Sequence, residues 1–379
     1  MKILNLLLGL TFLYPVLTEA LPTLVHNTPP PITAPAYLLQ DFHSNQIIME
    51  KNVDERLEPA SLTKLMTAYI VFRELHTGRF KLTDKVIISE KAWRILGSRM
   101  YLEVDSQVAI ELLLKGMIIQ SGNDASVALA EFIAGSEETF VALMNEQTQR
   151  LGLSNTHYTN STGLPNERHY SSVRDIVNLT QALIRDFPQY YRWYSMRKFT
   201  YNGITQENRN RLLRRDARVD GVKTGHTEAA GYCLVTSAKR GEMRLISVIM
   251  GATSEKNRIQ ESQQMLDYGF RFFETYRPYQ AHQPLDIQPL WHGTTNQLPL
   301  GLEQPLYVTV PTGNYKQLTA TLSLDKYITA PVMVGETYGS LKISLNQEVI
   351  SERPIIALSS IDKGSFWNRL IDSFLLLFY

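Results

Sequence analysis

The chain has 379 residues, of which 44% are hydrophobic and 20% are charged, and its formal net charge is +1. Single hydrophobic cores rarely grow beyond about 250–300 residues, so we expect at least two domains. The nearly balanced charge gives no global reason to bind nucleic acid, and we interpret the basic stretch at 209–223 as a solvated face. Composition and charge therefore favour a globular, multidomain protein without a nucleic-acid partner.

The first 20 residues have the layout of a secretory signal peptide. Lys2 precedes an apolar run from Ile3 to Leu17, and the small residue Ala20 ends the segment. This run is short for a membrane span, which needs about 20 residues, so we expect residues 1–20 to be removed on export. The single cysteine, Cys233, excludes an intramolecular disulfide and lies in an alternating stretch where we expect it to be buried.

Residues 21–277 mix strand and helix patterns. Alternating stretches predict a hairpin at 36–52 and a second one at 231–252, with its turn at Arg240 and Gly241. Apolar residues at helical spacing predict helices, three of which are opened or closed by a cap, a proline or a glycine. These helices are expected at about 60–78, 110–120, 121–135, 171–186 and 257–276.

The sequence pattern changes at Pro278. Short β-rich segments separated by Gly, Pro and Asn predict a small sandwich or barrel over 278–362, and we find no catalytic cluster in it. In the last segment, 363–379, large apolar residues recur at helical spacing, but the segment is too short to span a bilayer. We interpret it as an amphipathic helix lying on a membrane. The alternatives are a helix packed on its own domain or an unstructured tag.

A serine and a lysine lie three residues apart where a helix begins, in "EPASLTKLM". A serine hydroxyl is a weak nucleophile near neutral pH and needs an adjacent base. Residues three apart share a helix face, so the amine of Lys64 can reach the hydroxyl of Ser61, and burial can hold that amine neutral. Alone the pattern is weak, because a helix cap followed by a surface lysine has the same spacing.

Two further motifs supply what this pair lacks. Ser121 and Asn123 flank a glycine at the start of a predicted helix, and Lys223, Thr224 and Gly225 follow a loop and precede a strand. Separately, these motifs could be an ordinary helix cap and a hairpin turn. Together and in this order they match the S-x-x-K, S-x-N and K-T-G set of the penicillin-recognising serine acyltransferases.

The chain resembles the low-molecular-mass penicillin-binding proteins, which are D-alanyl-D-alanine carboxypeptidases of the Gram-negative periplasm. The segments "EPASLTKLMT", "IIQSGNDAS", "LGLSNTHYTNSTGL", "VDGVKTGHTEAAGY" and "GFRFFET" carry the resemblance, which covers nearly the whole mature chain. It implies an α/β domain of β-lactamase type, with an antiparallel sheet covered by helices on both faces. A small all-β C-terminal domain and an amphipathic C-terminal helix would follow.

The resemblance also implies a function in peptidoglycan biosynthesis and cell shape. The enzyme would remove the terminal D-Ala from peptidoglycan stem peptides and would be acylated by β-lactams, without a metal or cofactor. It would lie in the periplasm, held peripherally on the outer face of the inner membrane by its C-terminal helix. A homodimer is compatible with this arrangement.

The catalytic roles follow from the resemblance, motif by motif. Ser61 would attack the carbonyl of the penultimate D-Ala, and Lys64 would be the general base. Ser121 and Lys223 would relay protons, and the backbone N–H groups of Ser61 and His226 would form the oxyanion hole.

The substrate-binding roles are implied in the same way. Asn123 would hydrogen-bond the substrate amide, and Gly225 belongs to the K-T-G motif that lines the site. Thr224 and Arg209 would bind the terminal carboxylate, for which an arginine fork is well suited. Leu164 would lie in the loop that borders the deacylating water.

That loop departs from the family pattern, with Thr162 in place of a histidine and Pro165 after the leucine. The balance between peptide hydrolysis and lasting penicillin capture is therefore left open. One alternative is a β-lactamase of the same fold, in which Glu167 would activate water, and another is an inactive scaffold acting through its C-terminal domain. A G-x-S-x-G elbow and an H-E-x-x-H metal motif are both missing from the sequence, and its eight histidines are scattered.

Overall fold

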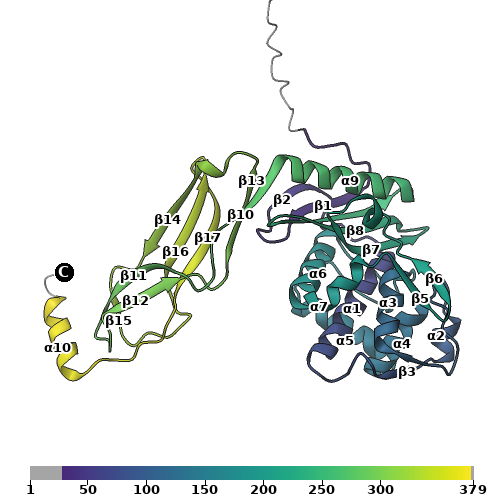
Figure 1. Cartoon of the computed structure of the whole chain (residues 1–379), viewed down its shortest axis with the longest axis horizontal. Coiled ribbons are helices and arrows are strands. Elements are labelled where there is room, and N and C mark those ends of the chain that lie inside the picture. The colour runs from purple at the N-terminus through teal and green to yellow at the C-terminus, as the bar shows by residue number, and fades with distance from the viewer. Residues whose placement is uncertain (1–27, 377–379) are drawn as a thin grey trace, which may run out of the picture.

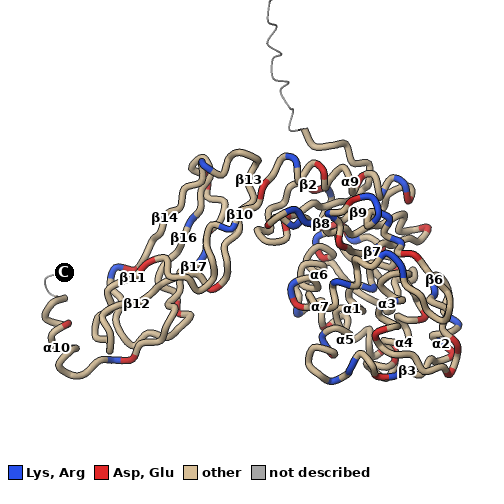
Figure 2. The backbone as a smooth tube through the Cα atoms, in the orientation of Figure 1, with Lys and Arg blue, Asp and Glu red and all other residues tan. Residues whose placement is uncertain are grey.

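The computed structural model describes residues 28–376, and the predicted signal peptide lies outside this range. A larger helix-and-sheet domain and a smaller β-rich domain lie end to end, with the C-terminal helix at the far end of the smaller one (Figure 1). Basic and acidic residues are interspersed along both domains (Figure 2). The predicted division into two folded parts is thus present.

The larger domain is built on a five-stranded sheet with the order β2-β1-β9-β8-β7, in which all neighbouring strands are antiparallel. Its strands are β1 (Ala36–Asp41), β2 (Ile47–Lys51), β7 (Val219–Thr227), β8 (Gly231–Arg240) and β9 (Met243–Ala252). Consecutive residues point to opposite faces, so Leu38 enters one hydrophobic core and Leu39 the other. Both faces of the sheet are therefore covered, as predicted.

Helix α9 (Glu255–Phe272) packs on one face, whereas α6 (Val173–Asp186) and the central α1 (Lys64–His76) lie on the other. The remaining helices and short hairpins surround α1. They are α2 (Glu90–Arg94), α3 (Ile110–Ile119), α4 (Asn123–Ala134), α5 (Glu137–Arg150), α7 (Pro188–Tyr191), α8 (Leu212–Arg215), β3 (Lys85–Ile87), β4 (Gln107–Ala109), β5 (Lys198–Tyr201) and β6 (Ile204–Glu207).

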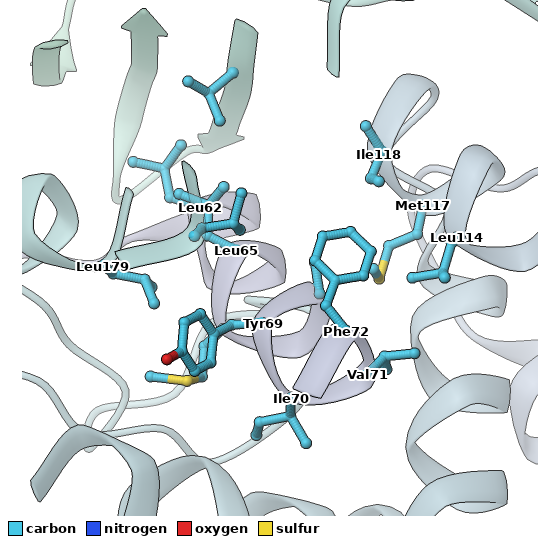
Figure 3. Packing of buried hydrophobic residues seen from close by; sticks show 14 of the residues in the cluster. Leu62, Leu65, Tyr69, Ile70, Val71, Phe72, Leu114, Met117, Ile118 and Leu179 are labelled. Carbon is cyan, nitrogen blue, oxygen red and sulfur yellow. The ribbon is translucent and has the colours of Figure 1, made fainter. Parts of the chain in front are cut away.

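Helix α1 is buried on every side. Leu65, Tyr69 and Phe72 pack into the core together with Met117 of α3 and Leu179 of α6 (Figure 3). Every residue of α1 from Lys64 to Phe72 is buried, and truncating one of its large apolar side chains to alanine typically costs about 2–5 kcal/mol. The start of α1 is therefore held rigidly, and that start carries the Ser-Lys pair.

The smaller domain contains a six-stranded sheet, β14-β16-β17-β12-β11-β15, and a separate pair, β10-β13, which share one hydrophobic core. Its strands are β10 (Phe273–Tyr279), β11 (Pro284–Trp291), β12 (Gln297–Gly301), β13 (Leu306–Pro311), β14 (Leu318–Leu324), β15 (Ile328–Thr329), β16 (Thr337–Leu345) and β17 (Glu348–Ala357). The expected boundary at 277/278 falls inside β10, which follows α9 directly and pairs with β13.

The last element of the described residues is α10 (Phe366–Leu375), in agreement with the predicted C-terminal helix. Its six large apolar side chains are between 50% and 69% exposed. Within residues 28–376, the length and apolar character that a bilayer-crossing helix needs do not occur in any helix.

Candidate active site

The serine of the first motif lies in a short 3-10 turn, η1 (Ala60–Thr63), directly before α1. Ala60 has a φ of +45°, a conformation that non-glycine residues rarely adopt and that is common near functional sites. Lys64 is the first residue of α1, only 1% exposed, and its Nζ lies 3.0 Å from Ser61 Oγ. The prediction that this lysine is buried beside the serine is confirmed.

Lys64 has three hydrogen-bond partners, which together orient its amine. Besides Ser61 Oγ, Nζ contacts Asn123 Oδ1 at 2.7 Å and the backbone oxygen of Thr162 at 2.6 Å. An amide oxygen and a backbone carbonyl only accept hydrogen bonds, whereas the Ser61 hydroxyl can also donate. A neutral amine donates its two hydrogens to those two oxygens, so its lone pair faces Ser61. This geometry suits a base that removes the serine proton.

Electrostatics favours the neutral form of that amine. Burial and then the positive charge of Arg209, opposed by Asp124, together lower the pKa of Lys64 to about 7. Burial and then the charge of Lys64 lower the pKa of Lys223 well below its ordinary value. The two amines therefore disfavour each other's charged form, and Arg209 is the cation that acts most strongly on Lys64.

The second motif forms a strained turn at the start of α4. Ser121 has a φ of +67° and Gly122 is the residue before the helix. Lys223 Nζ donates to Ser121 Oγ at 2.8 Å and to the Thr224 carbonyl at 2.9 Å, and both serine and lysine are buried. Ser121 and Lys223 are thus placed to pass a proton between them.

Asn123 and Asp124 hold the neighbouring segment 96–102 in place. Asn123 Nδ2 donates to the Leu96 carbonyl at 2.6 Å, so its amide is engaged at both ends. The buried carboxylate of Asp124 accepts the backbone N–H groups of Met100, at 3.0 Å, and of Leu102, at 3.2 Å. Asp124 could not be predicted from the sequence, because a residue that binds only backbone groups has no motif of its own.

The third motif lies in the middle of an edge strand rather than in a hairpin turn. Lys223, Thr224 and Gly225 pair with β8 within β7, and the turn comes after Thr227. A Cβ atom on Gly225 would lie 3.0 Å from the Pro59 carbonyl oxygen and 3.3 Å from Ser61 N. Only glycine lets β7 pass this close to the nucleophile, which brings the backbones of Ser61 and His226 to one place.

The His226 side chain does not join this cluster. Its imidazole is exposed and lies over the Tyr232 ring, with 4.0 Å between the ring centroids. The arrangement leaves the backbone N–H as the group through which His226 can act on a reacting carbonyl.

A polar hollow of about 420 Å³ is lined by Gln120, the residue before Ser121, and by Asn208, Arg209 and Arg258 among others. Arg209 Nε donates to the Gln120 carbonyl at 3.0 Å. In the described part of the chain, Arg209 has no carboxylate within 4 Å, whereas Arg211, Arg214 and Arg258 each pair with a glutamate. Its charge is therefore available for an anionic ligand. Arg258, which sequence analysis missed, donates to the Gly225 carbonyl at 3.0 Å and supports β7.

The loop with Leu164 wraps around one side chain. Asn160 Oδ1 accepts the backbone N–H groups of Thr162, Gly163 and Leu164 at 3.1, 2.7 and 3.2 Å. Thr162, which departs from the family pattern, contacts Lys64 through its backbone oxygen, so the departure leaves this contact intact. Glu167 is exposed. A backbone acceptor leaves no signature in a sequence, so this contact could not have been predicted.

Two family models match the chain. A model described as D-alanyl-D-alanine carboxypeptidase, peptidase family S11, matches residues 23–254, and the C-terminal domain of penicillin-binding protein 5 matches residues 273–363. The chain belongs to this carboxypeptidase family. The second match begins at Phe273, the first residue of β10.

Individual relatives agree with this assignment. D-alanyl-D-alanine carboxypeptidase DacA of Escherichia coli is 42% identical over 92% of this chain and 89% of its own length. D-alanyl-D-alanine carboxypeptidase DacF of Bacillus subtilis is 37% identical over 88% and 87%. The crystal structure of penicillin-binding protein 5 from Haemophilus influenzae is 41% identical, with a TM-score of 0.85 over 89% of this chain and 99% of that one.

Proposed function

We propose that this member of the carboxypeptidase family removes the terminal D-Ala from peptidoglycan stem peptides through an acyl-enzyme on Ser61, which β-lactams also acylate. The observation that carries the proposal is the Lys64 amine, buried 3.0 Å from Ser61 Oγ with its other two partners restricted to accepting. Family membership supports the reaction class.

Acylation begins when Ser61 Oγ attacks the carbonyl carbon of the penultimate D-Ala and its proton passes to Lys64 Nζ. The negative charge then grows on the carbonyl oxygen, where the backbone N–H groups of Ser61 and His226 receive it. Such a donor contributes about 2.7–4 kcal/mol in other serine hydrolases. The peptide C–N bond breaks, and the leaving amine takes a proton from Ser121, which lies 2.8 Å from Lys223. The proton that Lys64 took from Ser61 then restores the Ser121–Lys223 pair and leaves Lys64 neutral.

The substrate's free carboxylate is placed by charge. Among the described residues, Arg209 lines the hollow without a carboxylate within 4 Å, and Arg258 of the same lining donates to the Gly225 carbonyl, which follows Thr224 in β7. Asn123 is held by Lys64 at its amide oxygen and by the Leu96 carbonyl at its amide nitrogen, which leaves the second hydrogen of Nδ2 to bind the peptide. An enzyme built in this way selects peptides with a terminal carboxylate, which is the property of a carboxypeptidase.

Deacylation separates this proposal from a β-lactamase of the same fold. Water must add to the ester carbonyl of the acyl-enzyme, on the side where the Leu164 loop lies. Glu167, the residue that a β-lactamase mechanism would use, is exposed on that loop. A slow release of bound penicillin is therefore expected.

The test uses the chain without residues 1–20 and 366–379, mixed first with a fluorescent penicillin and then with a peptide ending in D-Ala-D-Ala. We expect covalent labelling and released D-alanine, both abolished in Ser61→Ala and both retained in the control Ser136→Ala, which alters only the N-cap of α5. Labelling without D-alanine release would indicate a scaffold, and fast penicillin turnover a β-lactamase.

We also propose that α10 holds the enzyme on the outer face of the inner membrane. The backbone N–H of His292 donates to Asp372 Oδ2 at 2.6 Å, and His292 Nε2 lies 3.0 Å from Ser373 Oγ. The polar side of α10 thus faces the β-rich domain and its apolar side faces outward. A helix packed on its own domain for stability would have the opposite orientation, so the exposed face fits a membrane surface.

Membrane attachment is tested by sedimentation of the mature chain with phosphatidylethanolamine and phosphatidylglycerol vesicles. We expect binding to be lost in Phe366→Ser/Phe374→Ser and kept in Arg369→Gln, with hydrolysis of a soluble peptide equal in all three proteins. Undiminished vesicle binding by the double variant would contradict the proposal. Analytical ultracentrifugation of the vesicle-free protein tests the homodimer, which stays a prediction.

A further inference from the structure

A buried histidine outside the three motifs lies against the turn that carries the nucleophile. His169 is 2% exposed, its Nε2 lies 2.8 Å from Thr63 Oγ1, and its Nδ1 lies 3.1 Å from the backbone N of Thr159. Thr63 Oγ1 donates its only hydrogen to the Ala60 carbonyl at 2.8 Å. The hydroxyl therefore accepts from His169 Nε2–H, while Nδ1 accepts from Thr159. The imidazole is neutral in this arrangement. It connects Thr159, at the start of the loop with Leu164, to Thr63 of the turn η1.

The loop with Leu164 also lies in close contact with the turn η1. A Cβ atom on Gly163 would lie 1.8 Å from the Ala60 carbonyl oxygen and 2.8 Å from Thr63 Oγ1. One residue earlier, the Thr162 carbonyl accepts from Lys64 Nζ at 2.6 Å. The position of this loop therefore decides where one of the three partners of the base lies.

His169 does not itself exchange protons with a substrate. Burial, followed by the charges of His157 and Lys64, lowers its pKa to about 4, so it stays neutral at physiological pH. Both ring nitrogens are already occupied by protein groups. Any effect of His169 on the reaction must pass through the loop and the turn.

We propose that His169 is a positioning residue that holds the Thr162 carbonyl on Lys64, and that it matters most for hydrolysis of the acyl-enzyme. The inference rests on the roles proposed above for Ser61 and Lys64. In the free enzyme Nζ has three partners, but in the acyl-enzyme Ser61 Oγ is an ester oxygen with no proton to donate. Only Asn123 and Thr162 then hold the amine. Deacylation, in which water adds to the ester carbonyl and the C–Oγ bond breaks, thus depends more strongly on the loop than acylation does.

The test compares two rates for one fluorescent penicillin: its attachment to the mature enzyme and its release from the acyl-enzyme. His169→Leu removes both ring contacts and Thr63→Val removes the hydroxyl between ring and turn. In each variant we expect the release rate to fall about tenfold, which is the effect expected from losing one hydrogen bond. The attachment rate should change much less. The conservative His169→Gln keeps an N–H that reaches Thr63 and should recover most of the release rate.

A double-variant cycle separates this chain of contacts from a general loss of packing. If His169 acts through Thr63, the combined His169→Leu/Thr63→Val enzyme releases penicillin no more slowly than either single variant. Additive effects, or attachment and release slowed by the same factor, would overturn the inference.

Two controls keep the result interpretable. Thr180→Val makes the same chemical change at another buried threonine, whose hydroxyl bonds to the Ile176 carbonyl within α6, and should leave the ratio of the two rates unchanged. Thermal unfolding shows whether His169→Leu is folded; if it is not, Thr63→Val and His169→Gln carry the test. Labelling that persists in Ser61→Ala would contradict the proposed function itself, whereas normal release by the His169 variants would remove only this inference.

Discussion

The buried environment of Lys64 determines the pH range in which the enzyme can be acylated. Since burial lowers its pKa to about 7, the amine is half neutral near that pH and becomes protonated below it. A protonated amine cannot accept the Ser61 proton. We therefore expect the rate of penicillin acylation to fall as the pH drops, with a midpoint near pH 7, measured by stopped-flow labelling between pH 5 and 9.

The charge of Arg209 is the second cause of this shift, which makes it testable separately. Arg209→Gln removes a positive charge that disfavours protonated Lys64, so the midpoint should move to higher pH. Arg209→Lys keeps the charge and should keep the midpoint. The midpoint rather than the maximal rate is the readout, because Arg209 is also expected to bind the substrate carboxylate. Equal midpoints in all three enzymes would exclude this electrostatic coupling.

At the residue scale, the sequence was informative where the chemistry needs a particular side chain. The Ser-Lys pair and the contact between Ser121 and Lys223 follow from motifs, because a nucleophile, a base and a relay each require their own functional group. The action of Arg209 on Lys64 depends on the fold alone. So does the Thr162 carbonyl, which any residue at that position would supply.

At the scale of elements, the loop with Leu164 depends on one glycine. Gly163 has a φ of +86°, and a side chain there would collide with the Ala60 carbonyl before Ser61. Gly163→Ala must therefore displace the loop or the turn. We expect it to slow both penicillin acylation and release more than tenfold, and to lower the free energy of unfolding by well over 1 kcal/mol.

Gly152→Ala is the matched control for this prediction. Gly152 also has a positive φ, +67°, but an added Cβ would meet nothing within 4 Å. Both variants carry the same backbone strain, about 1–2 kcal/mol. Only Gly163→Ala should lose labelling by fluorescent penicillin, and similar activities would mean that the contact with Ala60 has no role.

The elements that the sequence predicted poorly are those in which glycine misleads. The stretch "VDGVKTGHT" contains two glycines and reads as a loop before a strand, yet it forms β7. Pairing with β8 stabilises it, and Gly225 is needed for close approach to Ser61 rather than for a turn. Helices α4, α6 and α10 were predictable, because their apolar periodicity and caps are local.

At the scale of the whole molecule, a hydrogen-bond network joins the two domains around Asp41. This buried carboxylate ends β1 and accepts from Thr275 Oγ1 of β10 at 2.7 Å. It also accepts from the backbone N–H of Ser44 at 2.8 Å, and Thr309 of β13 lies 2.6 Å from the Ser44 hydroxyl and 2.9 Å from that of Thr275. Because α10 lies at the far end of the β-rich domain (Figure 1), this joint sets where the active site lies relative to the helix.

Thr275→Val tests how much this joint contributes. The change keeps the shape of the side chain but leaves Asp41 Oδ2 without its donor, and a hydrogen bond to a charged group is worth about 1.5–3 kcal/mol. We expect the free energy of unfolding to fall by about that amount, with a more variable domain arrangement in small-angle X-ray scattering. Penicillin labelling should stay normal, because the site lies wholly within the larger domain.

Thr321→Val, on the exposed side of β14, controls for the same chemical change away from the joint. A scattering profile identical to that of the wild type, with undiminished stability, would contradict this prediction. It would mean that the direct continuation of α9 into β10, rather than Asp41, fixes the positions of the two domains relative to each other.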